Sequence, residues 1–190
     1  MKNTLLLIID LINDIVHTDS KVTTSAQNIQ DNNVLDKVNH AIQYARKNNL
    51  PIVHTKIGFS PNYIECPTGS PLLKHAKEKN AFCLNTWGTE FHKTVDVKPE
   101  DTIMTKHRVS ALYATPLECL LRANHISTVI ICGVSTDMAI ESTVRELHDR
   151  DYNVIVLSDA CGAASEEIHQ ASLKSLKRLA IIQSSDELIF

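Results

Sequence analysis

Two ionisable residues of opposite charge stand at the ends of apolar segments that are far apart in the chain. Asp10 directly follows the apolar run Leu5–Ile9, and Lys106 ends the segment Thr102–Lys106. If both segments are parallel strands, their carboxyl ends share the sheet edge where ligands bind in open α/β folds. Burial raises the pKa of a carboxyl group and a nearby cation lowers it, so Asp10 and Lys106 could form a proton-transfer couple. A buried structural ion pair is the alternative, as is an Asp10 that caps the turn after it.

A third candidate for chemistry is the segment Gly133–Asp137, which follows a β-branched run and precedes an amphipathic helix. The start of a helix has free backbone N–H groups that can hold an anion or a developing oxyanion. An ordinary turn with Thr136 or Asp137 as N-cap is the alternative. A phosphate loop and a dinucleotide fingerprint are excluded, since neither G-x-x-x-x-G-K-[ST] nor G-x-G-x-x-G occurs. Asp159, after a further predicted strand, is another candidate at this edge.

The other reactive residue types form no recognisable site. The nine histidines include no HExxH pair, so we expect no metal and no cofactor. The five cysteines are scattered without a CxxC pair, which argues against a disulfide framework or a zinc knuckle. A G-x-S-x-G elbow is absent, which argues against a serine hydrolase of that type. Trp87 and Tyr113 could line a pocket or simply pack against their neighbours.

Short apolar segments alternate with longer amphipathic ones, which predicts parallel β-α-β units and a sheet covered on both faces. The predicted strands are Thr4–Ile9, Pro51–Thr55, Thr102–Lys106, Thr128–Cys132, Asn153–Leu157 and Ala180–Gln183. The predicted helices are Val34–Asn48, Thr115–Asn124, Asp137–Asp149 and Glu166–Leu179. Thr115 is the expected N-cap of its helix, with Pro116 as the first helical residue. Ile57–Asn80 and His17–Asn33 are expected to be irregular, and loops of such length are often binding loops or lids.

Composition and charge limit the class of protein. The chain has 190 residues, of which 43% are hydrophobic and 22% charged, and its formal net charge is −3. These values fit a single domain over residues 1–190 that needs no metal or disulfide to fold. The acidic balance argues against a nucleic-acid partner. The apolar run at 5–12 is too short to cross a membrane and residues 1–4 lack the features of a signal peptide, so we expect a cytoplasmic protein with no membrane partner.

Four sequence blocks together resemble the isochorismatase-like hydrolase family, also called the cysteine hydrolase family. They are Leu6–Asp14, Thr105–Leu112 with Thr115-Pro116-Leu117, Val129–Met138, and Asp159-Ala160-Cys161. The resemblance covers nearly the whole chain. It implies a three-layer αβα sandwich of Rossmann-like type with a six-stranded parallel sheet. It also implies a small-molecule substrate and a homo-oligomer, either a dimer or a tetramer.

The resemblance further implies roles for individual residues. Asp10 and Lys106 match the family's catalytic Asp and Lys, and the Val134–Ser135 peptide matches a cis bond that aims backbone N–H groups at a substrate oxygen. Substrate contacts are expected from residues near the predicted strand ends: Trp87, Tyr113, Thr136 and Met138. One branch of the family carries an Asp-x-His metal motif after the second strand. Residues 54–58 lack that pattern, so we again expect no metal.

The departure from the family pattern is Ala139, which stands where most members carry a nucleophilic cysteine. A methyl group cannot attack a carbonyl carbon, so the usual acyl-enzyme route is closed at this position. Cys132 is expected to be a buried, inert thiol, and Cys161 is a candidate replacement if it reaches the rim of the cleft.

Three interpretations of Ala139 therefore stay open. Asp10 could act as general acid on a vinyl ether, as in isochorismate hydrolysis, with Lys106 as its partner and water as the nucleophile. The chain could instead be an amide hydrolase whose cysteine was replaced by Ala139, although Ile12 departs from the family's usual glutamine. It could also bind a small molecule without turnover.

Overall fold

A six-stranded parallel sheet forms the centre of the computed structural model, which describes residues 3–20, 22 and 25–188. The strand order is β3-β2-β1-β4-β5-β6. The strands are β1 (Thr4–Ile9), β2 (Ile52–Ile57), β3 (Thr102–Lys106), β4 (Thr128–Val134), β5 (Asn153–Gly162) and β6 (Ile181–Gln183). In the middle of the sheet, Ile8 of β1 lies opposite His54 of β2 and Cys132 of β4. The predicted α/β fold class is confirmed, and each predicted strand has a counterpart.

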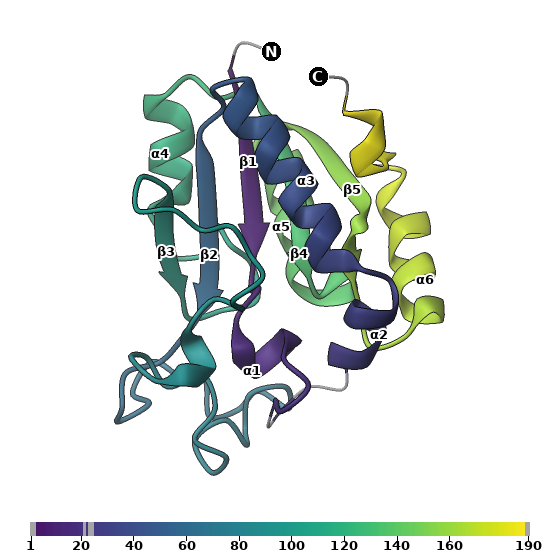
Figure 1. The fold of residues 1–190 in the computed structure, drawn as a ribbon. Helices are drawn as coiled ribbons and strands as arrows, with labels where there is room; N and C mark the ends of the chain where they lie inside the picture. Colours follow the sequence, from purple (N-terminus) through teal and green to yellow (C-terminus); the bar gives the residue numbers. More distant parts are fainter. Residues whose placement is uncertain (1–2, 21, 23–24, 189–190) are drawn as a thin grey trace.

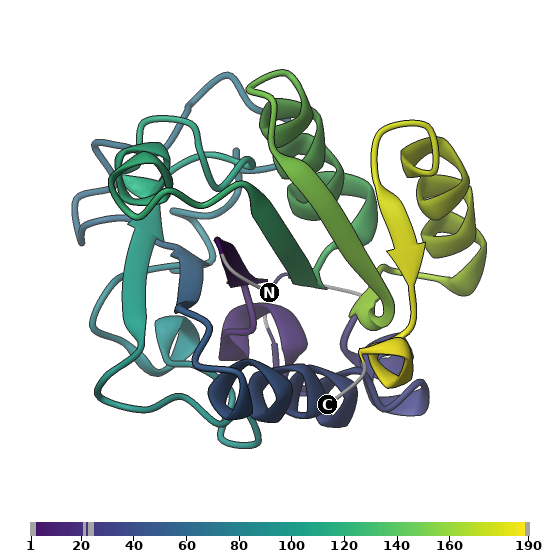
Figure 2. The same cartoon turned by 90° about the horizontal axis from the view of Figure 1, so that it is seen from above.

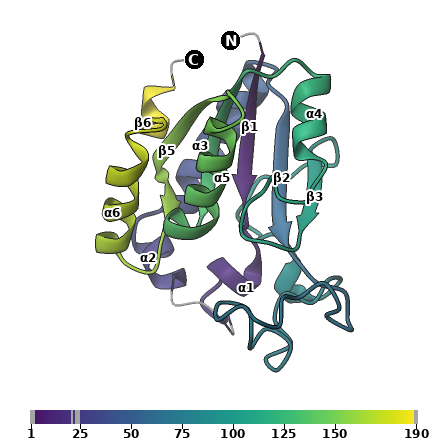
Figure 3. The ribbon, with the colours of Figure 1, turned by 180° about the vertical axis from the view of Figure 1, so that it is seen from behind.

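Helices cover both faces of the sheet and produce three layers (Figures 1 and 2). The helix α3 runs along one face, whereas α4, α5 and α6 lie on the other face, which is seen from behind in Figure 3. The helices are α1 (Asn13–Val16), α2 (Ala26–Asp31), α3 (Val34–Lys47), α4 (Leu117–Ala123), α5 (Glu141–His148) and α6 (Glu166–Leu176). Three single turns are η1 (Trp87–Thr89), η2 (Thr136–Ile140) and η3 (Ser185–Glu187). In the described part of the chain, no helix has the length and apolar content to span a bilayer.

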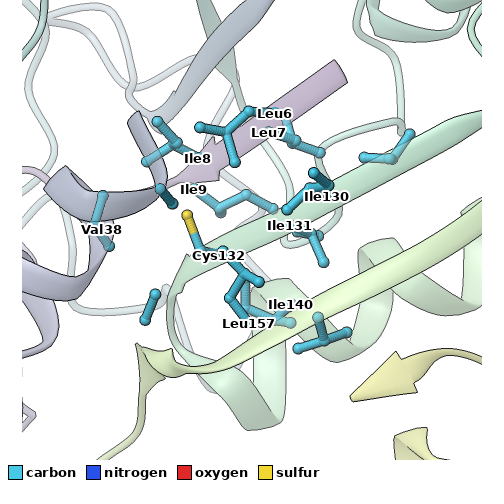
Figure 4. Packing of buried hydrophobic residues seen from close by; sticks show 14 of the residues in the cluster. Leu6, Leu7, Ile8, Ile9, Val38, Ile130, Ile131, Cys132, Ile140 and Leu157 are labelled. Carbon is cyan, nitrogen blue, oxygen red and sulfur yellow. The ribbon is translucent and has the colours of Figure 1, made fainter. Parts of the chain in front are cut away.

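The main core lies between these layers. All residues of β1 are buried, because helices cover both faces of a parallel sheet and leave no polar side. On α3, the buried stripe includes Val38, Ala41 and Ile42, as its helical periodicity predicts. Cys132 lies among the apolar side chains of this core (Figure 4), and burial raises the pKa of its thiol well above the ordinary value. The prediction that Cys132 is a buried thiol is confirmed.

The strands extend further at their carboxyl ends than the sequence predicts. β2 continues to Ile57, β4 to Val134 and β5 to Gly162. The added residues of β4 and β5 pair with each other after an irregularity in the ladder, at Gly133–Cys161 and Val134–Gly162. Such pairing depends on neighbouring strands and leaves no trace in the local hydrophobic pattern. The prediction that Asp159 and Cys161 follow the fifth strand is therefore wrong, since both lie within β5.

Two helix starts also differ from the prediction. α4 begins at Leu117, so the N-cap position belongs to Pro116 rather than Thr115. The Thr115 hydroxyl donates a hydrogen bond to the Ala111 carbonyl at 2.6 Å, which ties it to the preceding turn. The predicted helix at 137–149 is divided into a π-helical turn, η2, and α5. Part of the segment expected to be irregular at 17–33 forms α2, and α1 precedes it.

The segment between β2 and η1, residues 58–86, contains neither a helix nor a ladder strand but encloses a second, smaller apolar cluster. We call this segment the β2–η1 loop. Its cluster consists of Ile12, Ile57, Phe59, Tyr63, Leu73, Ala76, Ala81, Phe82 and Cys83, all buried. The Phe82 N–H donates to the buried Asp14 carboxylate at 2.7 Å, and the Tyr63 hydroxyl donates to the Ala81 carbonyl at 2.8 Å. The irregular segment predicted at 57–80 is therefore packed in place below the sheet edge (Figure 1).

Candidate active site

Asp10 and Lys106 meet at the carboxyl edge of the sheet. The Lys106 Nζ lies 2.6 Å from the Asp10 Oδ2, and the Asp10 Oδ1 accepts a hydrogen bond from the Ile57 N–H at 2.7 Å. Because β2 lies between β1 and β3, the two side chains meet over the end of β2 at Ile57. The predicted pairing is thus present, and it depends on a strand order that brings β1, β2 and β3 together.

The Lys106 ammonium has no unused hydrogen-bond donor. Besides Asp10, it donates to the carbonyl of Arg108 at 3.1 Å and to the carbonyl of Val109 at 3.0 Å. An ammonium has three N–H donors, so these contacts satisfy all of them. The side chain is only 1% exposed, and its long stem packs within the protein while the turn after β3 wraps around its charged end. Lys106 is therefore held in one position against Asp10.

Asp10 sits where the chain leaves the sheet. Its backbone has a φ of 58°, in the left-handed region, and its N–H donates to the Thr55 carbonyl at 2.9 Å. Burial raises the pKa of the Asp10 carboxyl, and the Lys106 charge and the Ile57 N–H offset part of that rise. A buried carboxyl whose pKa is shifted by desolvation and balanced by one defined cation has the properties of a proton-transfer group.

The turn after β4 forms the next part of the site. Gly133 has a φ of 116°, and a Cβ at this position would lie 2.2 Å from the Ile9 carbonyl oxygen, so only glycine permits this close approach of β4 to β1. The peptide bond between Val134 and Ser135 is cis, the conformation that the family resemblance implies. The π-helical turn η2 follows and carries Met138 and Ala139. Single π turns are frequent at functional sites.

These groups share one cavity of about 230 Å³. The sheet edge and the turn after β4 contribute Asp10, Ile57, Lys106, Val109, Val134, Ser135, Met138 and Ala139. The β2–η1 loop contributes Leu72, Leu73, His75, Ala76, Lys79 and Phe82, and Ile15, Val22 and Ser25 complete the lining. Ala139 is 4% exposed, yet it lines the same cavity as the Asp10–Lys106 pair. Ala139 therefore places a methyl group, which cannot act as a nucleophile, on the wall of the cavity that holds the ion pair.

Three residues predicted to contact substrate do not line this cavity. Trp87 packs edge-on against His17, with ring centroids 5.0 Å apart. Tyr113 is exposed on the turn after β3. Thr136 is fully buried behind the cavity wall, where its hydroxyl hydrogen-bonds the His169 Nδ1 at 2.8 Å. Among the four predicted contacts, Met138 lines the cavity.

Asp159 and Cys161 also lie away from the cavity. The Asp159 carboxylate accepts hydrogen bonds from the Ser185 N–H at 2.6 Å and the Ser185 hydroxyl at 2.7 Å, so it anchors the turn η3. Cys161 lines a separate hollow beside α6, and burial raises the pKa of its thiol to about 12. A buried thiol with a raised pKa that does not line this cavity is not placed to act as a nucleophile on a ligand there.

The cavity-lining residues of the β2–η1 loop were not predicted from the sequence. Leu72 and Leu73 precede Ala76 by four and three residues, and Lys79 follows it by three, which is the signal that could have indicated one common face. Residues 3–20, 22 and 25–188 contain no group of three or more His, Cys, Asp or Glu side chains that could hold a metal ion. The site is therefore built from one ion pair, one backbone turn and a largely apolar wall.

Comparison with known proteins identifies the family. A model of the isochorismatase domain matches residues 4–187, nearly the entire chain. The chain belongs to the isochorismatase family. Among characterised relatives, the ureidoacrylate amidohydrolase RutB of Methylobacterium radiotolerans is 31% identical over 157 residues, which cover 76% of this chain and 61% of that protein. The chain thus spans about three fifths of the length of the amidohydrolase that it matches.

Two further family members match over their whole length. The uncharacterized isochorismatase family protein YecD of Escherichia coli O157:H7 is 27% identical over 192 residues, covering 99% of this chain and 95% of that protein. The crystal structure of an isochorismatase family protein from Desulfovibrio vulgaris superposes with a TM-score of 0.88, covering 99% and 97% of the two chains at 19% identity. This structural likeness supports the fold, and the family assignment rests on the domain match.

Proposed function

We propose that this isochorismatase-family protein hydrolyses a small molecule, with Asp10 as the proton-transfer group and water as the nucleophile. The observation that carries the proposal is the position of Ala139, whose methyl lines the same cavity as the ion pair of Asp10 and Lys106. A methyl group forms no covalent intermediate. A buried carboxyl with a raised pKa can donate a proton, so the chemistry falls to Asp10.

A vinyl ether is the substrate class that best fits a site with a proton donor and no nucleophile. Asp10 transfers its proton to the terminal carbon of the C=C bond, and the ether oxygen shares an electron pair to give an oxocarbenium ion. Water adds to the cationic carbon and returns a proton to Asp10. The resulting hemiketal breaks its C–O bond and releases a carbonyl compound and an alcohol.

Lys106 has a defined part in this scheme. After the first proton transfer, Asp10 is a carboxylate in a cavity lined mostly by apolar side chains, where an isolated charge is costly. The Lys106 ammonium at 2.6 Å stabilises that charge, and its bonds to the Arg108 and Val109 carbonyls keep it in place. Lys106 thus lowers the barrier to proton donation and is itself unchanged at the end of the cycle.

Turnover in D₂O tests the proposal directly. With isochorismate as substrate, we expect the pyruvate released to carry one deuterium in its methyl group. The acidic hydrogen of Asp10 exchanges with D₂O, so Asp10 transfers a deuteron to the terminal carbon. Asp10→Asn should abolish turnover and leave the far-UV circular dichroism spectrum unchanged, since the amide keeps the shape but lacks the acidic proton. Full activity of Asp10→Asn, or pyruvate without deuterium, would refute this mechanism.

Amide hydrolysis is the second candidate, favoured by the likeness to ureidoacrylate amidohydrolases. Here Asp10 would act as the base that activates water, and backbone N–H groups near Ser135 would face the amide oxygen. Ala139→Cys separates the two candidates, because it places a thiol in the cavity beside Asp10. Amide turnover that appears only in Ala139→Cys would assign the site to an amidohydrolase scaffold. Amide turnover by the unchanged chain would favour direct attack by water.

A further inference from the structure

We infer that the cavity selects ligands that carry a carboxylate, and that Lys79 of the β2–η1 loop binds this group at the cavity mouth. The inference rests on the proposed function only in taking this cavity as the substrate site. Two features of the cavity support it: the charges of the side chains that line the cavity, and the contacts by which the loop holds Lys79 in place.

When Asp10 is ionised, the charges at the base of the cavity cancel. Both Asp10 oxygens are engaged, one by Lys106 and the other by the Ile57 N–H, and all three Lys106 donors are used. This pair therefore offers no surplus charge to a ligand. Among the described residues that line the cavity, Asp10 is the sole acidic side chain.

The cavity mouth carries a positive charge that no described residue compensates. Lys79 lines the cavity, and in the described part of the chain its ammonium has no hydrogen-bond or ion-pair partner. His75 also lines the cavity, but its Nδ1 lies 2.8 Å from the Glu78 Oε2, so that carboxylate already faces it. Lys79 is thus left as the group that can meet an anion.

The loop holds Lys79 by backbone bonds and by packing on either side of it. Its own N–H donates to the His75 carbonyl at 3.0 Å, and the Ala81 N–H donates to the Ala76 carbonyl at 2.8 Å. Leu73 and Ala76 before it, and Phe82 after it, are buried in the loop cluster. The tether from the Phe82 N–H to the buried Asp14 carboxylate fixes the end of this turn. An ammonium on such an anchored turn loses less freedom on binding than one on an open loop.

The rest of the lining defines the body of the ligand. Apolar side chains, among them Leu72, Phe82 and Met138, line the same cavity as Lys79 and the Asp10–Lys106 pair. The complementary molecule has an apolar or unsaturated body of a size that fits about 230 Å³, with a carboxylate at the end that faces the mouth. In this pose the reacting group of the ligand lies toward Asp10.

Binding calorimetry with a matched pair of probes tests the inference. Cyclohex-1-ene-1-carboxylate and the corresponding carboxamide have the same shape and differ in charge. We expect the carboxylate to bind about fivefold more tightly, the scale of a partly exposed ion pair, and its advantage to shrink at high salt. Lys79→Met should remove this advantage and leave carboxamide affinity unchanged, and Lys79→Glu should reverse the preference.

The control is Lys77→Met, which removes an exposed lysine of the same loop that does not line the cavity. This variant should bind both probes like the unchanged protein. Equal affinity of the unchanged protein for the two probes, no binding of either, or equal losses in Lys77→Met and Lys79→Met would each overturn the inference. The measurement needs no turnover. If Asp10→Asn keeps full activity while Lys79 still confers carboxylate preference, the proposed mechanism fails and this inference stands.

Discussion

The cavity has two walls that are built in different ways. On one side, Asp10 and Lys106 are almost completely buried at the ends of hydrogen-bonded strands, and the turn after β4 follows directly from the ladder. On the other side, the β2–η1 loop has neither helix nor ladder strand and depends on a small cluster around Phe59, with Leu72 58% exposed. Under the proposed function, the sheet wall places the reacting groups and the loop wall shapes the ligand that reaches them. The two walls share Ile57, which belongs to the loop cluster and whose N–H donates to the Asp10 carboxylate.

The largest effect is expected from breaking the ion pair of the sheet wall. Lys106→Met removes the partner of a buried carboxylate, so the free energy of unfolding should fall by about 3–5 kcal/mol near neutral pH. Urea denaturation measures this loss. Lowering the pH should reduce it, because protonated Asp10 needs no cation. Lys77→Met, at an exposed position of the loop, is the control and should change the free energy of unfolding by less than about 0.5 kcal/mol. A loss of that small size in Lys106→Met would contradict the structural account.

Removing one apolar side chain from each wall should produce different losses of stability and different patterns of amide exchange. Ile131→Ala, in the centre of β4, should lower the free energy of unfolding by about 2–5 kcal/mol and accelerate amide exchange throughout the sheet. Leu73→Ala should cost less, because its smaller cluster leaves room to collapse, and should accelerate exchange mainly within residues 58–86. Hydrogen exchange with mass spectrometry distinguishes the two patterns. Equal acceleration in β1 and in the loop of Leu73→Ala would show that the walls unfold as one unit.

The smallest effect is the pH dependence that Asp10 adds to stability. Its pKa is raised in the folded protein, so the folded state holds the Asp10 proton more tightly than the unfolded state does. The contribution of Asp10 to stability should therefore decrease as pH rises from the ordinary carboxyl value through the raised value, and then level off. Subtracting the free energy of unfolding of Asp10→Asn from that of the unchanged protein, at each pH, isolates the pH-dependent contribution of Asp10 to stability. A difference that stays constant between about pH 4 and pH 8, a range that spans the ordinary carboxyl value, would contradict it.

The two walls also differ in how well they could be predicted from the sequence. The apolar runs and the stripe on α3 predicted a parallel sheet and the alternation of strands and helices along the chain, and the strand-end rule predicted that Asp10 and Lys106 lie close together. The predicted strands β4 and β5 end too early, because the last residue pairs between them form after an irregularity in the ladder. The position of Thr136 away from the cavity also depends on a long-range contact, because its hydrogen-bond partner His169 comes from a distant helix.

The sequence by itself determined the alternation of strands and helices, the carboxyl group of Asp10 and the amino group of Lys106 at the ends of two predicted strands, and the alanine at position 139. These follow from local patterns of hydrophobicity and from residue type. Tertiary structure alone decided that the loop after β2 folds back as a wall, that Lys79 faces the cavity, and that Trp87, Tyr113 and Thr136 do not. The physical reason is that burial of the loop cluster and the bond from Phe82 to Asp14 join segments whose proximity no local pattern encodes.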